Sequence, residues 1–134
     1  ADAIARTKAE VETGRQLVIF PEGTRRPPGA APDYKRGIQR LYRDLGVPVI
    51  PVVMHPGLFW PRGSFRRQSG HFKVRILPPI APGKEPRQFF DQLVETMERE
   101  SDRLLIETVD ANPHVDLPEV TRERVAELRA SDGA

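Results

Sequence analysis

The sequence predicts an α/β fold in which a mixed, mostly parallel sheet is flanked by helices. Segments with helical spacing alternate along the chain with short apolar segments that are typical of strands. The first apolar segment, residues 17–20 (LVIF), is unbroken, which is typical of a strand buried on both faces in a parallel sheet. The length of 134 residues suits one domain with a modest core.

The first quarter of the chain predicts a helix, a strand and a long loop. Residues 3–12 contain no helix breaker, and Gly14 follows as a C-cap, so we expect a helix there. Residues 15–20 are then expected to form the buried strand. Residues 21–34 (PEGTRRPPGAAPDY) are dense in proline and glycine and predict a loop.

The next segments predict a second helix and a second strand. Residues 35–45 place apolar side chains at helical spacing, and Gly46 closes that helix. Residues 47–54 (VPVIPVVM) have the composition of a strand. Its two prolines cannot donate to a ladder, which places the strand at a sheet edge or at a bulge.

The second half of the chain predicts a third strand and a long helix. Residues 55–70 are expected to form a loop, and residues 71–77 (HFKVRIL) alternate as in a half-exposed strand. A long helix is predicted to begin near residue 87. Beyond residue 112 we expect a charged C-terminal tail, residues 113–134, with a short helix at about 118–130. The long helix carries an apolar stripe that consists of Phe89, Phe90, Leu93, Val94, Met97, Leu104 and Leu105.

Charge is distributed unevenly along the chain. Residues 1–83 contain 14 basic and 6 acidic side chains, whereas residues 84–134 contain 7 basic and 13 acidic ones, so the net charge of +2 hides a basic first part. A basic surface attracts phosphate groups. The chain has no cysteine and therefore no disulfide or thiolate nucleophile. No apolar run approaches the roughly 20 residues that span a bilayer, and the first residues do not resemble a secretory signal.

The segment FPEGTR, residues 20–25, carries the chemistry that points to a ligand. It follows the predicted strand, and open α/β sheets bind ligands at the carboxyl ends of their strands. Gly23 allows the backbone to approach an anion closely, while Thr24 and Arg25 offer a hydroxyl and a guanidinium suited to phosphate. Residues 20–25 therefore predict an anion site of phosphate type.

A structural interpretation of the same residues is also open. Glu22 could pair with Arg25 or Arg26 and only hold a loop in place, because surface ion pairs are common and contribute about 0 to 1 kcal/mol. Arg26, Lys35 and Arg36 add positive charge nearby under either interpretation.

Three segments in order resemble the third and fourth sequence blocks of the glycerolipid acyltransferases, in particular the 1-acylglycerol-3-phosphate acyltransferases. They are FPEGTR at residues 20–25, YKRG at 34–37 and VPVIPV at 47–52. GLFWPR at 57–62 and VRILPPIAPG at 74–83 also resemble bacterial members. The resemblance extends over residues 14–105, so residues 1–112 are interpreted as the C-terminal half of an acyltransferase domain.

The resemblance implies a reaction and a set of substrate-binding residues. The family moves a fatty acyl group from acyl-CoA or acyl carrier protein to the free hydroxyl of lysophosphatidic acid, which gives phosphatidic acid in phospholipid biosynthesis. Glu22, Gly23, Thr24 and Arg25 would help hold the glycerol phosphate, with Lys35 a weaker contributor. The VPVIPV block, including Pro51, would shape the acyl or acceptor pocket.

The resemblance also implies where the protein works and what it needs. We expect it at the cytoplasmic face of the membrane, either peripheral or anchored by a missing N-terminal segment. No cofactor is expected beyond the acyl thioester donor. The sequence contains no metal-ligand spacing.

The general base of the family is not found in this sequence. Acyl transfer to an alcohol needs a group that accepts the hydroxyl proton, and the family uses a His and an Asp separated by four residues, upstream of FPEGTR. No histidine precedes Phe20, and neither His55 nor His71 has the required carboxylate. His114 has Glu119 at that spacing, but at the wrong end of the chain. We therefore assign no catalytic residue and expect the chain alone to be inactive in acyl transfer.

Two alternative functions can be weighed against the sequence. The first is a non-catalytic module that binds phospholipid headgroups at a membrane surface. Its aromatic loop, with Trp60 and Phe65 among arginines, would lie at the bilayer, although these aromatics could instead cap the core. The second is nucleic-acid binding, which is not expected because the basic residues follow no RNA-binding motif. His55 could touch substrate or simply end a strand.

Overall fold

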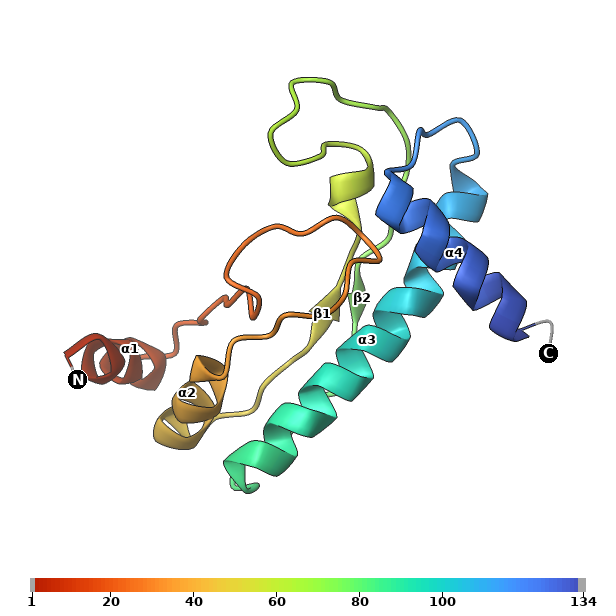
Figure 1. The fold of residues 1–134 in the computed structure, drawn as a ribbon. Coiled ribbons are helices and arrows are strands. Elements are labelled where there is room, and N and C mark those ends of the chain that lie inside the picture. Colours follow the sequence, from red (N-terminus) through yellow and green to blue (C-terminus); the bar gives the residue numbers. More distant parts are fainter. Residues whose placement is uncertain (1, 133–134) are drawn as a thin grey trace.

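The computed structural model describes residues 2–132, which form four α-helices, a 3-10 helix and a small sheet. Figure 1 shows α3 as a long axis of the molecule, with the two strands along one side, α4 crossing its C-terminal end and α1 at the far side. In chain order the elements are α1 (Asp2–Glu12), α2 (Gly37–Leu45), β1 (Val52–Val53), η1 (Pro56–Leu58), β2 (Arg75–Ile76), α3 (Pro86–Ala111) and α4 (Glu119–Asp132).

The long helix α3 confirms the helix predicted from residue 87. It begins at Pro86, where a missing N–H costs no helical hydrogen bond. The side chain of Glu85 caps it by accepting from the backbone N–H groups of Arg87, at 3.1 Å, and Gln88, at 3.0 Å. Of the predicted apolar stripe, the four buried members are Phe89, Leu93, Leu104 and Leu105.

The sheet consists of β1 and β2, which pair antiparallel with Val52 opposite Ile76. Two further contacts extend the pairing: an isolated bridge joins Val49 to Ile80, and the Leu77 N–H donates to the Pro51 carbonyl at 2.9 Å. The ladder is interrupted because Pro48 and Pro51 have no N–H to donate.

Side chains alternate between two environments along residues 50–55. Val53 and His55 are buried on the side of α3, whereas Val52 and Met54 are exposed on the opposite face. On the neighbouring strand Ile76, which pairs with Val52, is exposed as well. The sheet therefore packs one face against α3 and leaves an apolar face uncovered in the described residues.

The mixed α/β class is consistent with the described residues, but one predicted strand is wrong and the predicted sheet type is not observed in them. Residues 15–20 form no strand, and the side chains of Leu17, Val18, Ile19 and Phe20 are exposed. The expected mostly parallel sheet is absent from residues 2–132, whose two-stranded sheet is antiparallel. An apolar run becomes a strand only when a neighbouring strand satisfies its backbone groups, and no other part of residues 2–132 pairs with residues 15–20.

The core consists of three clusters that all include side chains of α3. Near its N-terminal end, Phe89 stacks on Tyr42 of α2 with ring centroids 3.7 Å apart. In the middle, Leu104 packs with Val53 and Leu77 from the two strands or their ends. Towards the C-terminal end, Leu105 packs with a group formed by Leu58, Phe59, Val115 and Val125.

The other helices match the sequence prediction closely. Helix α2 ends at Gly46, whose φ of +61° is favourable only for glycine and whose N–H donates to the Tyr42 carbonyl. Helix α4 forms within the predicted charged tail and buries Thr121 and Val125. The division of the chain at residue 112 stays a prediction. None of the helices in residues 2–132 combines the length and apolar composition needed to cross a bilayer.

Candidate functional site

Residues 20–25 begin with a tight turn that explains the glycine in FPEGTR. The Gly23 N–H donates to the Phe20 carbonyl at 2.9 Å, and Gly23 has a φ of +71°, in the left-handed region. A Cβ at this position would meet only Lys35 Cγ, at 3.9 Å, so space does not exclude a side chain. Gly23 is therefore required for the backbone conformation rather than for close packing.

Glu22 holds the loop through two contacts. Its Oε2 accepts a hydrogen bond from the Asp33 N–H at 2.9 Å and lies 3.3 Å from Nε of Arg26. The structural interpretation of this carboxylate is therefore observed, with Arg26 as the partner. Because both contacts join residues of the loop spanning 21–34, Glu22 fixes the shape of the loop that presents Thr24 and Arg25.

Thr24 and Arg25 lie exposed on the surface, next to an arginine from a distant loop. The Arg62 side chain donates from Nη1 to Thr24 Oγ1 at 2.7 Å. Arg25 forms no ion pair or side-chain hydrogen bond with any other residue in the range 2–132. Two arginines without a carboxylate partner among these residues are therefore next to Thr24, Arg25 in sequence and Arg62 through its hydrogen bond, which is favourable for binding an anion.

Lys35 is already paired within the protein. Its Nζ lies 2.6 Å from Oδ2 of Asp33, which is also 3.8 Å from Nη1 of Arg26. The hydrogen bond and the charge of Lys35 hold the pKa of Asp33 below its usual value. A phosphate group would have to compete with Asp33 for Lys35, so Lys35 is the weaker of the two predicted cations.

Tyr34 attaches the end of this loop to α3. Its hydroxyl donates to Glu98 Oε1 at 2.9 Å in a partly buried contact. Burial raises the pKa of Tyr34, and the nearby charge of Glu98 raises it further. Burial also raises the pKa of Glu98, although the Tyr34 hydrogen bond opposes that effect. The loop is thus anchored at its end by a hydrogen bond that is shielded from water.

Pro51 lies in a different environment from the other predicted binding residues. It is buried, and its carbonyl accepts from the Leu77 N–H. Its exposed neighbours on the opposite face of the strand are Ile50 and Val52. The structure therefore brings Glu22, Gly23, Thr24, Arg25 and Lys35 together on one loop, while Pro51 is a structural part of the sheet.

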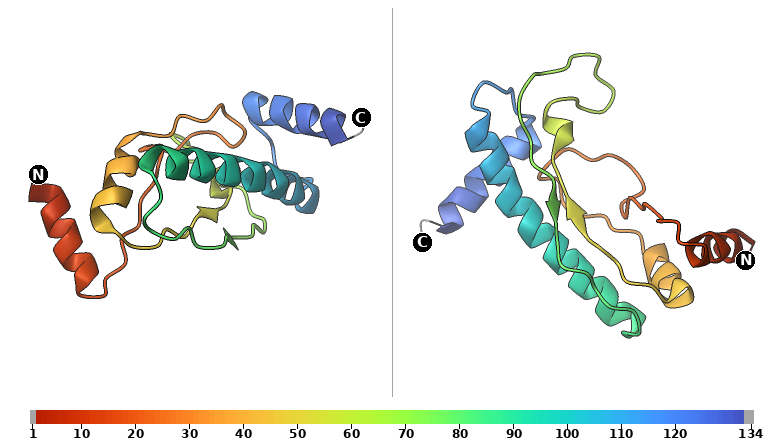
Figure 2. Two further views of the ribbon diagram at one scale, coloured as in Figure 1. Left: turned by 90° about the horizontal axis from the view of Figure 1, so that it is seen from below. Right: turned by 180° about the vertical axis from the view of Figure 1, so that it is seen from behind.

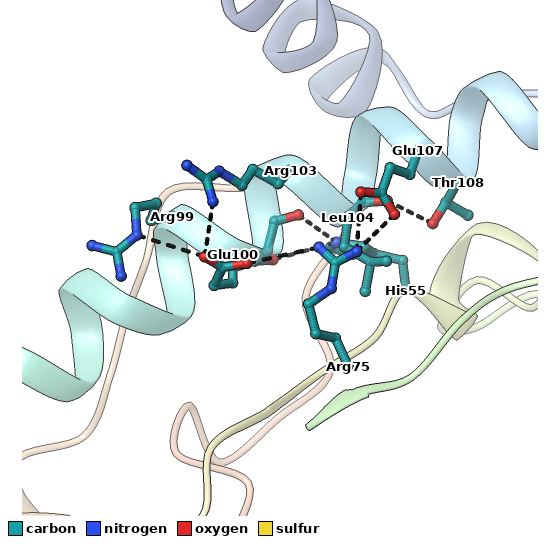
Figure 3. Close-up of polar contacts among 9 residues, drawn as sticks. His55, Arg75, Arg99, Glu100, Arg103, Leu104, Glu107 and Thr108 are labelled. Carbon is teal, nitrogen blue, oxygen red and sulfur yellow. Dashed lines mark hydrogen bonds and ion pairs between the residues drawn. The ribbon is translucent and has the colours of Figure 1, made fainter. Parts of the chain in front are cut away.

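His55 points from the end of β1 towards α3 (Figure 3) and is buried. Its Nε2 lies 2.8 Å from the Ser101 carbonyl oxygen, and because a carbonyl can only accept, Nε2 carries the proton. Burial lowers the pKa of His55, while the Ser101 carbonyl and Asp102 act in the opposite direction. These contacts give His55 a packing role.

Figure 3 also shows an ion-pair network that joins β2 to α3 beside His55. Arg75 of β2 contacts Glu107 at 2.8 Å and Glu100 at 3.7 Å. Glu100 in turn lies 3.3 Å from Arg103. The network joins β2 to α3, and its carboxylates neutralise the charge of Arg75.

No catalytic pair of the family type is formed by the described residues. His114 Nε2 lies 2.7 Å from the Ser69 carbonyl oxygen, and no hydrogen bond joins His114 to Glu119 within residues 2–132. In the same residues no group of three or more His, Asp or Glu side chains is placed to hold a metal ion.

A cleft of about 280 Å³ lies near the N-terminal ends of α2 and α3 and is lined by Arg36, Gln39, Arg87 and Asp91. None of the six predicted binding residues lines it. The candidate site on residues 22–25 is an open surface, whereas Arg36 belongs to this separate cleft.

The contact between Arg62 and Thr24 was not predicted from the sequence. The two residues are 38 positions apart, and the contact depends on how the loop of residues 59–70 folds back. One signal was available: no Asp or Glu occurs between Asp44 and Glu85, so Arg62 has no acidic partner nearby in sequence. An unpaired arginine within GLFWPR was therefore a candidate for contact with another segment or with an anion.

Comparison with known proteins agrees with the predicted resemblance. The family model described as Acyltransferase matches residues 1–55. A 1-acyl-sn-glycerol-3-phosphate acyltransferase of Pseudomonas aeruginosa is 36% identical over 78 residues, which cover 58% of this chain and 30% of that protein. A 1-acyl-sn-glycerol-3-phosphate acyltransferase alpha of Homo sapiens is 40% identical over 63 residues, which cover 46% of this chain and 22% of that protein.

A plant relative extends the same pattern, but only part of each relative is represented. The 1-acyl-sn-glycerol-3-phosphate acyltransferase of Limnanthes alba is 34% identical over 70 residues, which cover 52% of this chain and 25% of that protein. The chain therefore matches less than a third of the length of these relatives. No solved structure matches the chain. The family model over residues 1–55 and the similarity to these relatives support the glycerolipid acyltransferase family for this chain.

Proposed function

We propose that this chain supplies the acceptor-binding part of an acyltransferase of phospholipid biosynthesis. The enzyme would transfer a fatty acyl group from acyl-CoA or acyl carrier protein to the free hydroxyl of 1-acylglycerol 3-phosphate. The match to the acyltransferase family model and the similarity to the relatives support the reaction class. The single observation that carries the proposal is the unpaired Arg25 beside the Thr24–Arg62 contact, on a loop held in shape by Glu22.

The acceptor phosphate would be bound mainly by Arg25. Its guanidinium can donate two parallel hydrogen bonds to phosphate oxygens, and no carboxylate of residues 2–132 competes for it. The Thr24 hydroxyl can donate one more. Lys35 would contribute after partial release from Asp33, while Glu22 would position the loop, since a carboxylate repels a phosphate.

The sheet would serve the acyl chain. Pro51 holds the strand against β2, and the exposed side chains of Ile50 and Val52 offer an apolar surface on the outer face. We propose that residues 15–20 join a mostly parallel sheet in the complete acyltransferase domain. Their exposed apolar side chains support this, since such a run is stable in water only when it is covered.

The proton of the acceptor hydroxyl needs a base, which the family supplies as a His and an Asp separated by four residues. The hydroxyl oxygen attacks the thioester carbonyl, a carbon–oxygen bond forms, the thiolate leaves, and the hydroxyl proton must pass to a base. No His-x-x-x-x-Asp sequence occurs in the chain. We therefore expect the chain alone to bind the acceptor without forming phosphatidic acid. Formation of phosphatidic acid from lysophosphatidic acid and acyl-CoA, above the rate of Glu22→Ala, would contradict this.

A second candidate is a non-catalytic module that binds phospholipid headgroups, and the exposed aromatic side chains of Trp60 and Phe65 support it. The two candidates differ in their preferred ligand. An acceptor site must fit the free hydroxyl of lysophosphatidic acid, whereas a headgroup module should bind diacyl phosphatidic acid equally well. Under both candidates the protein would work at the cytoplasmic face of the membrane, where these lipids are located.

Calorimetric titration with glycerol 3-phosphate tests the shared part of the proposal. Arg25→Ala should weaken binding roughly ten- to a hundredfold, because a charge-assisted hydrogen bond contributes about 1.5 to 3 kcal/mol. Arg122→Ala is the matched control, since Arg122 is exposed on α4 and has no ion pair among residues 2–132. Equal affinities of Arg25→Ala and the parent chain would remove Arg25 from the site.

A further inference from the structure

The loop of residues 59–70, between η1 and β2, extends away from the helices (Figure 1) and exposes aromatic side chains. Phe65 is fully exposed and Trp60 is about half exposed. The polar edge of Trp60 is already satisfied, because Nε1 donates to the Ser64 carbonyl at 3.0 Å. Both aromatics can therefore enter an apolar medium without losing a hydrogen bond to water.

The same loop carries positive charge that residues 2–132 neutralise only in part. Its three arginines lie in a stretch, residues 45–84, that contains no Asp or Glu. Arg62 donates to the neutral Thr24 hydroxyl, and the Arg67 guanidinium lies 3.9 Å from the centre of the Trp60 ring. Among residues 2–132, Arg66 is the only one of the three that meets a carboxylate, that of Asp116 at 3.2 Å, and both side chains of that pair are largely exposed.

The base of the loop is held in place, so these side chains are presented together. The Gln68 N–H donates to the Phe59 carbonyl at 2.7 Å, and its side-chain amide donates to the carbonyls of Leu58 and Asp116. Gln68 Oε1 accepts from the Asp116 N–H at 2.9 Å. The loop thus offers exposed aromatic rings and arginines on one fixed support.

We propose that the loop of residues 59–70 docks onto the surface of an anionic lipid bilayer. Aromatic rings are favourable at the interface between headgroups and acyl chains, and arginines are attracted by anionic headgroups. The unneutralised charge favours an anionic surface, and the fully exposed Phe65 favours a bilayer over a nucleic acid, which would offer only its bases for stacking.

Docking would also place the candidate site at the level of the headgroups. Arg62 belongs to the loop and contacts Thr24 at 2.7 Å, so the loop and residues 22–25 approach the bilayer together. A monoacyl phosphate could then reach Arg25 without leaving the membrane. This consequence rests on the proposed function, whereas the docking itself does not.

Sedimentation with lipid vesicles tests the docking in the 134-residue chain. The vesicles contain phosphatidylcholine alone or an equal mixture with phosphatidylglycerol, and no lysophosphatidic acid. We expect binding to the mixed vesicles, weaker binding to phosphatidylcholine, and loss of binding as salt is raised from about 0.05 M to about 0.5 M, where charges are screened. Equal binding to both vesicle types would overturn the anionic preference and with it the proposal.

Two loop variants and their matched controls locate the contact. Arg66→Gln with Arg67→Gln should weaken vesicle binding roughly thirtyfold, since each arginine near an anionic surface contributes about fivefold. Phe65→Ser should weaken it roughly tenfold through lost apolar contact. The controls, Arg6→Gln with Arg122→Gln and Val18→Ser, change exposed residues outside the loop and should bind like the parent chain.

The outcomes separate the docking from the proposed function. If the loop variants bind vesicles as tightly as the parent chain while circular dichroism shows both folded, the docking proposal is wrong. Displacement of vesicles by a single-stranded oligonucleotide at equal mass would also overturn it in favour of nucleic-acid binding. Arg25→Ala should lose glycerol 3-phosphate but bind vesicles within about fivefold of the parent chain. Loss of vesicle binding alone leaves the acceptor site unaffected.

Discussion

At the residue scale, the charged side chains of the FPEGTR loop differ in their contacts although they are close in sequence. Glu22 is engaged by the Asp33 N–H and by Arg26, whereas Arg25 has no partner among residues 2–132. The loop itself could be predicted from its prolines and glycines, whereas phosphate binding by it stays a prediction. The choice of Arg26 as the partner of Glu22 could not be predicted, because spacing along an irregular loop does not determine which side chains meet.

His55 carries a prediction at this scale. Burial lowers its pKa, so the folded chain holds His55 neutral, whereas the unfolded chain binds a proton near the usual pKa of 6.5. The stability that His55 contributes is therefore fully present above pH 6.5 and is lost as the pH falls through the lowered pKa. We expect the parent chain to lose more free energy of unfolding than His55→Asn between about pH 7.5 and about pH 5.5.

Urea denaturation at the two pH values measures this difference. His114→Asn is the control for the substitution itself, since His114 is an exposed histidine. An identical change in unfolding free energy for the parent chain and His55→Asn would mean that His55 does not take up the proton on unfolding.

At the scale of elements, the helices and the segments that contain β1 and β2 could be predicted, whereas the fate of residues 15–20 and the direction of strand pairing could not. A helix forms its backbone hydrogen bonds within one segment, so residues 3–12 and 35–45 could be predicted from their own sequences, and α1 and α2 lie where expected. The apolar run at residues 17–20 would form its backbone hydrogen bonds only with another strand, and its own sequence does not say whether that strand is present. The Arg62–Thr24 contact is equally non-local, and for the same reason the sequence did not reveal it.

Helix α4 contacts the loop of residues 21–34 through one buried hydrogen bond. The Thr121 hydroxyl donates to the Pro28 carbonyl at 2.6 Å, and Pro28 belongs to the loop of residues 21–34. Thr121→Val keeps the shape of the side chain but leaves that carbonyl unpaired. We expect a loss of about 1–3 kcal/mol in unfolding free energy.

The matched control for this prediction is Thr7→Val in α1. Thr7 also donates to a carbonyl, that of Ala3 at 2.8 Å, but on an exposed helix where water can replace the bond. Chemical denaturation should therefore show a clear loss for Thr121→Val and little change for Thr7→Val. Similar small effects in both variants would mean that α4 does not support the loop through this contact.

At the scale of the whole molecule, α3 joins all the parts that pack together. It contributes to each of the three core clusters and anchors the candidate loop through the bond between Tyr34 and Glu98. Figure 2 shows the same arrangement from two further sides, with α1 apart from α3 and the other elements beside it. We therefore expect cooperative unfolding of the molecule to depend on the packing of α3.

Leu104 tests this dependence, because it is fully buried in the middle cluster. Leu104→Ala should lower the unfolding free energy by about 2–5 kcal/mol, through lost apolar burial and the cavity that remains. Leu17→Ala, at an exposed position, should change it by less than about 0.5 kcal/mol. Thermal unfolding followed by circular dichroism compares the two variants, and equal effects would show that α3 is not the centre of the fold.

Our central proposal is that Arg25 and Thr24, with Arg62 beside Thr24, bind the phosphate of the acceptor on a loop that Glu22 holds in shape. The most direct measurement is a titration of the 15N-labelled chain with glycerol 3-phosphate, followed by NMR, with glycerol as the control ligand. We predict that the largest shift changes occur at the amides of Gly23, Thr24 and Arg25 and at Nε–H of Arg62, and that glycerol causes none of them. Changes confined to the cleft of Arg36, Gln39, Arg87 and Asp91, or no changes at all, would contradict the claim.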